Sequence, residues 1–139
     1  MLGVAVTALV AWVLTTMGGL NLLWGSLANG GLRHQPTKVT RFPTALTLGH
    51  LMLGVAGLVV WVFYLMTTHV AYAWTAFGSL VVVALLGFAM LTRWLVGRGG
   101  RHARTANREA SMVAVAVHGG VAIMTFVLVF FTAVVVTHG

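Results

Sequence analysis

Long apolar runs dominate the hydropathy pattern of the chain, and short polar segments separate them. Four such runs cover approximately residues 2–27, 44–68, 74–96 and 111–137. Each run is long enough for an α-helix to cross the hydrocarbon core of a bilayer, which takes roughly 20 residues. We therefore expect an all-α integral membrane protein, in which four helices form one bundle and residues 1–139 make a single transmembrane domain.

The composition agrees with a membrane location. The chain is 60% hydrophobic and 6% charged, and Glu109 is its one acidic residue. Such a chain cannot present a water-soluble surface. The first residues, MLGVAV, lack the basic segment and the small-residue cleavage site of a secretory signal. We therefore expect the first apolar run to be retained as a span.

The basic residues are confined to two segments and predict the orientation of the bundle. The net charge is +7, and all eight basic residues lie between the first and second runs or around the gap between the third and fourth. By the positive-inside rule, both basic loops are cytoplasmic and the two chain termini lie on the outer side. We expect a multi-pass protein of the inner (plasma) membrane that contacts membrane lipid. This orientation rule already explains the charge, so nucleic acid is not an expected partner.

The second half of the chain resembles the first. A shift of 68 residues pairs residues 1–71 with residues 69–139 without a gap. Chemically distinctive residues coincide under this shift: Gly19 with Gly87, His50 with His118, and Arg33-His34 with Arg101-His102. The pattern predicts a duplicated helical hairpin, in which the first and third spans are equivalent and the second and fourth are equivalent.

Two histidines interrupt the second and fourth apolar runs at the same depth. His50 follows Pro43 by seven residues, and His118 follows Ser111 by seven residues. At about 1.5 Å per residue, both imidazoles lie roughly 10 Å inside their helix starts. Ionisable side chains inside membrane spans are rare and are functional by default. We therefore expect His50 and His118 to face each other across the bundle.

A pair of neutral imidazoles at one depth suits the axial positions of a haem iron. The chain contains no cysteine, which excludes the covalent attachment of a c-type haem and any thiolate metal site. We expect His50 and His118 to be the metal ligands of one haem b that is bound without covalent attachment. In a structural alternative, the two histidines are core residues bonded to backbone carbonyls or to polar neighbours. In another, they carry protons or metal ions.

Six further residues are candidates for the lining of the haem site. Small residues lie four and seven positions beyond each histidine, on its helical face, where they leave room for a flat macrocycle or for close helix contacts. Asn21 is expected to accept the proton on the second nitrogen of an axial histidine, and Arg93 to attract the haem propionates at the cytoplasmic edge. An interhelical hydrogen bond and a snorkelling cation at a helix end are their alternative roles. The candidate cofactor-binding residues beside the histidines are thus Gly54, Gly57, Ala122, Thr125, Asn21 and Arg93.

Four spans, histidines from two of them and no covalent attachment motif resemble small b-type membrane cytochromes, namely the cytochrome b561-like and respiratory membrane-anchor proteins. The resemblance is architectural, covers the whole chain and rests on His50 and His118. It implies single-electron transfer as a subunit of a quinone-linked oxidoreductase, with quinone or other subunits of a membrane redox complex as partners. Those families often carry two haems, whereas this sequence offers one well-placed histidine pair. A non-catalytic accessory subunit of a larger membrane complex and a small proton or metal transporter are the alternatives.

Overall fold

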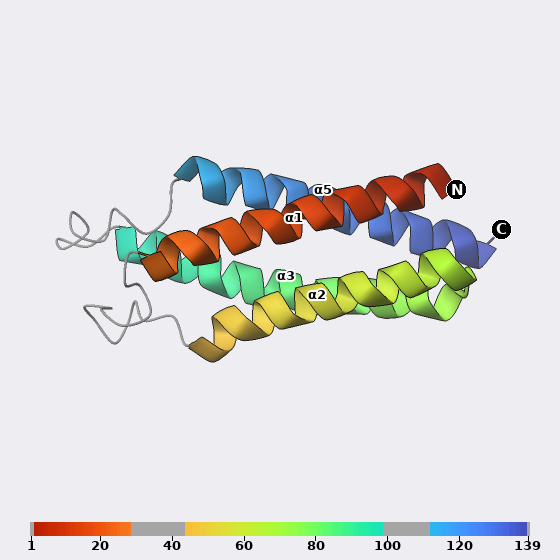
Figure 1. Ribbon diagram of the computed structural model, residues 1–139, viewed down its shortest axis with the longest axis horizontal. Coiled ribbons are helices and arrows are strands. Elements are labelled where there is room, and N and C mark those ends of the chain that lie inside the picture. The colour runs from red at the N-terminus through yellow and green to blue at the C-terminus, as the bar shows by residue number, and fades with distance from the viewer. Residues whose placement is uncertain (1, 29–43, 99–111, 139) are drawn as a thin grey trace.

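The computed structural model describes residues 2–28, 44–98 and 112–138 and places them in long helices (Figure 1). The helices of these described segments are α1 (Leu2–Ala28), α2 (Thr44–Thr67), α3 (Val70–Arg98) and α5 (Met112–His138). Each contains a stretch that is long and apolar enough to cross a membrane. The expectation of an all-α chain with four apolar helices is confirmed.

The connection between α2 and α3 is shorter than the sequence pattern indicated. Helix α3 begins at Val70, four residues before the start of the predicted third span. Thr68 has a φ of 56°, in the left-handed region that commonly ends a helix, and its backbone N–H donates to the carbonyl of Tyr64 at 2.7 Å. The alanines that follow are strong helix formers. A tight reversal at Thr68 and His69 therefore replaces the longer turn.

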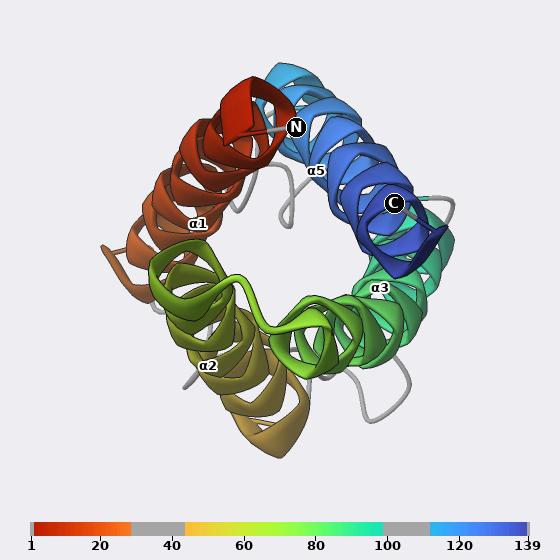
Figure 2. The same cartoon turned by 90° about the vertical axis from the view of Figure 1, so that its right-hand side faces the viewer.

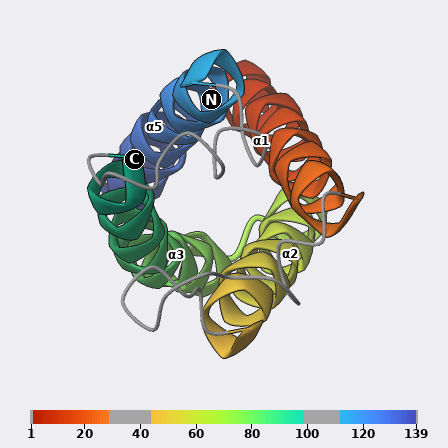
Figure 3. The same cartoon turned by 90° about the vertical axis from the view of Figure 1, so that its left-hand side faces the viewer.

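The four helices pack side by side around a square (Figures 2 and 3). Helix α1 contacts α2 and α5, and α3 contacts the same two helices. Helices α2 and α5 therefore lie on one diagonal of the square, and α1 and α3 lie on the other. The two chain ends and the α2–α3 turn share one end of the bundle, which we call the terminal end (Figure 1). At the opposite end, the loop end, α1 and α3 finish and α2 and α5 begin.

A packed core fills the terminal half of the bundle. Trp12 and Trp61 are its largest buried side chains, with ring centres 6.5 Å apart. The indole N–H of Trp61 donates to the carbonyl of Ala5 at 3.2 Å, and that of Trp12 to the carbonyl of Gly54 at 3.1 Å. Small buried residues surround the two indoles and allow the helices to approach closely; they include Ala5, Ala8, Ala73, Ala76 and Ala133.

The core ends abruptly toward the loop end. Every buried residue of the described segments lies at or before position 12 in α1, at or after 57 in α2, at or before 80 in α3, or at or after 125 in α5. In the loop half, all described side chains are partly or fully exposed. Both histidines of the predicted pair belong to this half. The packed core therefore does not extend to the level of the two histidines.

Candidate functional site

The two histidines that the sequence singles out meet inside the bundle. His50 lies six residues after the first residue of α2, and His118 lies six residues after the first residue of α5. Their helices are diagonal neighbours that make no direct contact, so the side chains span the interior between them. The two half-buried rings stand 6.5 Å apart between centres, with an angle of 65° between their planes.

The ring of His50 is held by the backbone of α3. Its Nδ1 atom lies 3.0 Å from the carbonyl oxygen of Val83. Because a carbonyl can only accept, the Nδ1 atom must carry the proton of this hydrogen bond, and Nε2 of the neutral ring keeps a free lone pair. The ring also rests on Gly87, where an added Cβ would lie 3.2 Å from Cε1 of His50. The second nitrogen is thus available as a metal ligand.

The ring of His118 makes a similar approach to α1. An added Cβ would lie 3.2 Å from its Cε1 atom at Gly19 and 3.4 Å from its Nδ1 atom at Gly18. The ring interacts with the backbone of Thr15, but its buried Nδ1 atom does not reach a hydrogen bond of standard geometry. His118 is therefore less firmly held than the first histidine.

The surroundings of the two rings correspond under the 68-residue shift. Val83 and Gly87, which contact one histidine, lie 68 residues after Thr15 and Gly19, which contact the other. The duplicated hairpin remains a prediction, and these paired contacts support it. The 68-residue shift of the chain on itself matched the two glycines, but it gave no sign that they face the histidines. An alignment of two halves of a sequence does not show which faces of the helices contact each other.

Two of the predicted lining residues lie in the layer beyond the histidines. Gly57 is buried against Trp12 and Ser79. Thr125 is also buried, and its hydroxyl lies 3.1 Å from the hydroxyl of Thr15. Both residues lie seven positions beyond their histidine, and seven residues advance about 10 Å along a helix. They therefore lie at the edge of the packed core and not at the level of the histidines.

The other predicted residues lie nearer the histidine pair or toward the loop end. Gly54 has no neighbour within 4 Å of an added Cβ, and Ala122 is half-buried. Arg93 is half-buried on α3, six residues beyond Gly87 toward the loop end. Asn21 is predicted to accept the proton on the second nitrogen of one of the two histidines; the structure shows His50 donating that proton to the Val83 carbonyl.

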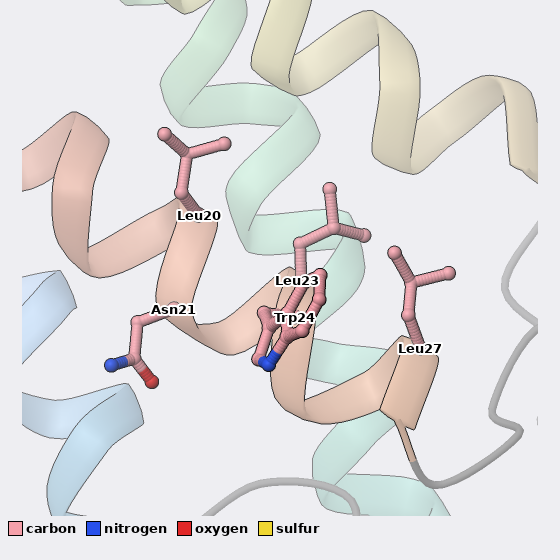
Figure 4. A pocket seen from close by; sticks show the side chains of 5 residues that line it. All are labelled: Leu20, Asn21, Leu23, Trp24 and Leu27. Carbon is pink, nitrogen blue, oxygen red and sulfur yellow. The ribbon is translucent and has the colours of Figure 1, made fainter.

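Asn21 instead lines an open groove on α1. The other lining residues of this groove are Leu20, Leu23, Trp24 and Leu27. Figure 4 shows the leucine side chains pointing to one side of the helix and the amide of Asn21 to another. The groove is therefore a surface of a single helix and is separate from the histidine pair.

The donor set limits the kind of metal that the site can hold. The described segments contain no group of three or more His, Cys, Asp or Glu side chains placed to bind an ion. Two imidazoles alone do not make a typical structural zinc site, which has four protein ligands. A haem needs only axial ligands from the protein, because its macrocycle supplies the other nitrogens.

Comparison of the chain with protein-family models, with curated proteins and with solved structures found no match. The functional argument accordingly rests on the geometry of the histidine pair.

Proposed function

We propose that the protein is a b-type membrane cytochrome that binds one haem b between His50 and His118 and transfers single electrons. One observation carries the proposal. Two imidazoles from diagonal helices meet at 6.5 Å inside the loop half of the bundle, beyond the packed core. Bound haem supplies a one-electron redox couple at such a position.

The spacing of the two rings agrees with a shared metal. A metal–imidazole bond is about 2 Å long, and the ring centre lies roughly 1 Å beyond the bound nitrogen, so two axial ligands hold their ring centres roughly 6 Å apart. The observed separation is 6.5 Å. The hydrogen bond from Nδ1 of His50 to the Val83 carbonyl leaves Nε2 as the ligand atom. The donor set therefore fits a bis-histidine haem.

The packed core and Arg93 lie on opposite sides of the histidine pair along the bundle. The buried indoles of Trp12 and Trp61 fill the interior toward the terminal end and exclude water there. We propose that Arg93, which is half-buried on α3 toward the loop end, attracts the propionates of a haem. We propose that the loop end faces the cytoplasm across the inner (plasma) membrane, and that quinone or a subunit of a membrane redox complex exchanges electrons with the site.

A structural role is the second candidate, and one observation favours it. The bond between His50 and the Val83 carbonyl joins α2 to α3 without any cofactor. In that case, the chain serves as a non-catalytic accessory subunit of a larger membrane complex. Transport of protons or metal ions has less support, because the packed core closes the path from the histidines to the terminal end.

Absorption spectra of the protein purified in detergent test the proposal. We expect one haem per chain and, after reduction, the sharp α and Soret bands of a bis-imidazole haem. His50→Ala and His118→Ala should each abolish or shift these bands. His69→Ala is the matched control, because His69 is an exposed histidine at the α2–α3 turn. Absence of the bands from wild-type protein supplied with haem contradicts the proposal, and so does equal loss in all three variants.

A further inference from the structure

Each histidine of the pair packs against a carbonyl and a glycine that are four residues apart on a neighbouring helix. On α3 these are the carbonyl of Val83, 3.0 Å from Nδ1 of His50, and Gly87. On α1 they are Thr15, whose backbone interacts with His118, and Gly19. The same pairing thus occurs twice, on helices that the 68-residue shift relates.

Helix geometry explains why a glycine stands at this spacing. A helical carbonyl points toward residue i+4, with which it makes its backbone hydrogen bond. A side chain at i+4 covers the approach to that carbonyl from a neighbouring helix, whereas glycine has no Cβ and leaves it open. At Gly87, a Cβ would lie 3.2 Å from Cε1 of His50, which is closer than most Cβ contacts. The ring would have to shift by a few tenths of an ångström.

We propose that Gly87 and Gly19 are positioning residues for the two histidines. At Gly87, the missing side chain lets the imidazole of His50 reach the carbonyl of Val83 one turn earlier, and that carbonyl holds the proton on Nδ1. At Gly19, the missing side chain leaves room for the ring of His118 beside α1. Nε2 of the ring then remains unprotonated and able to bind metal. The part of this inference that concerns metal binding rests on the proposed function, whereas the part that concerns the ring proton does not.

The two histidine rings differ in their hydrogen bonds to the neighbouring helix. The hydrogen bond of His50 is formed, whereas the Nδ1 atom of His118 stops short of one. Gly87→Ala therefore disturbs a hydrogen bond that is formed, whereas Gly19→Ala has none to disturb, so we expect the larger effect on the ring proton from Gly87→Ala. Gly78→Ala is the matched control on α3, because an added Cβ there meets nothing within 4 Å. Alanine is the better helix former at all three positions, so these changes do not weaken the helices themselves.

Nitrogen-15 NMR of the histidine rings tests the proton position in the full chain in detergent, before haem is added. We expect His50 protonated on Nδ1 in wild type and in Gly78→Ala. In Gly87→Ala, with unchanged helical circular dichroism, the Nδ1-protonated ring should become the minor form. An unchanged Nδ1 signal in Gly87→Ala overturns the inference. If this variant loses helicity, the wild-type ring decides, and a His50 ring that is not protonated on Nδ1 overturns the inference.

The reduction potential of the haem-loaded protein tests the second part. A hydrogen bond from Nδ1 makes the ring a stronger donor to the metal, so its loss in Gly87→Ala should raise the potential, with Gly78→Ala unchanged. A potential that is the same in both variants overturns the role in metal binding. If no haem binds but the ring proton moves, the proposed function fails and the positioning role stands. If haem binds and the ring proton does not move in Gly87→Ala, the proposed function stands and the positioning role fails.

Discussion

Gly57→Ala separates the packed core from the histidine site. In the structure, a Cβ at Gly57 would collide with the side chain of Ser79 and lie 2.9 Å from Cζ2 of Trp12. The indole cannot move away freely, because it is buried and its N–H is bonded to the carbonyl of Gly54 at 3.1 Å. Adding a methyl group to such a packed site costs about 1–3 kcal/mol. Alanine also gains roughly 1 kcal/mol in helix propensity over glycine, which a matched control must cancel.

Gly78→Ala is that control, because it brings the same gain in propensity without a contact within 4 Å. We expect Gly57→Ala to be less stable than Gly78→Ala by about 1–3 kcal/mol, measured by unfolding in mixed micelles with circular dichroism. The haem spectrum should stay unchanged, because Gly57 packs against Trp12 and lies about two turns beyond His50. Equal stability of the two variants would refute the packing argument. A changed haem spectrum in a Gly57→Ala variant of unchanged stability would instead indicate that Gly57 lines the haem site.

Three further predictions concern the polar layer, the core and the loop end. Thr15→Val and Thr125→Val, combined in a double-mutant cycle, should show a coupling of about 0.6 kcal/mol from their hydroxyl contact; zero coupling would contradict the contact. Trp61→Phe should lower the free energy of unfolding by about 1 kcal/mol or more, because the buried N–H bond to the carbonyl of Ala5 is lost; wild-type stability would argue against that bond. Arg93→Gln should lower the reduction potential of bound haem, since a nearby positive charge favours the reduced state. An unchanged potential in a redox titration would place the propionates elsewhere.

The sequence was sufficient to predict the helices and the depth of the histidine pair. Runs of apolar residues define spans without knowledge of their neighbours, and equal offsets from the helix starts place His50 and His118 at one level. The length of the α2–α3 turn was overestimated, because a positive φ at a threonine, as at Thr68, has no reliable sequence signal.

The sequence was less informative about the surroundings of the histidines. All four helices are apolar on every side, so periodicity does not show which face turns inward. Small residues on the same helix, such as Gly57, were therefore assigned to the haem site, and this assignment stays a prediction. The glycines that contact the histidine rings, Gly19 and Gly87, lie on other helices. A backbone carbonyl such as that of Val83 leaves no trace in the sequence, because every residue carries one.

The central claim is that one iron is bound by His50 and His118 together. Electron paramagnetic resonance of the oxidised protein, with nitrogen-15 label in the histidines alone, tests this most directly. The account predicts a low-spin haem coupled to two histidine nitrogens, and a loss of one coupling in each of the variants His50→Ala and His118→Ala. A high-spin haem, a single histidine nitrogen in wild type, or the same spectrum in the variants would contradict it.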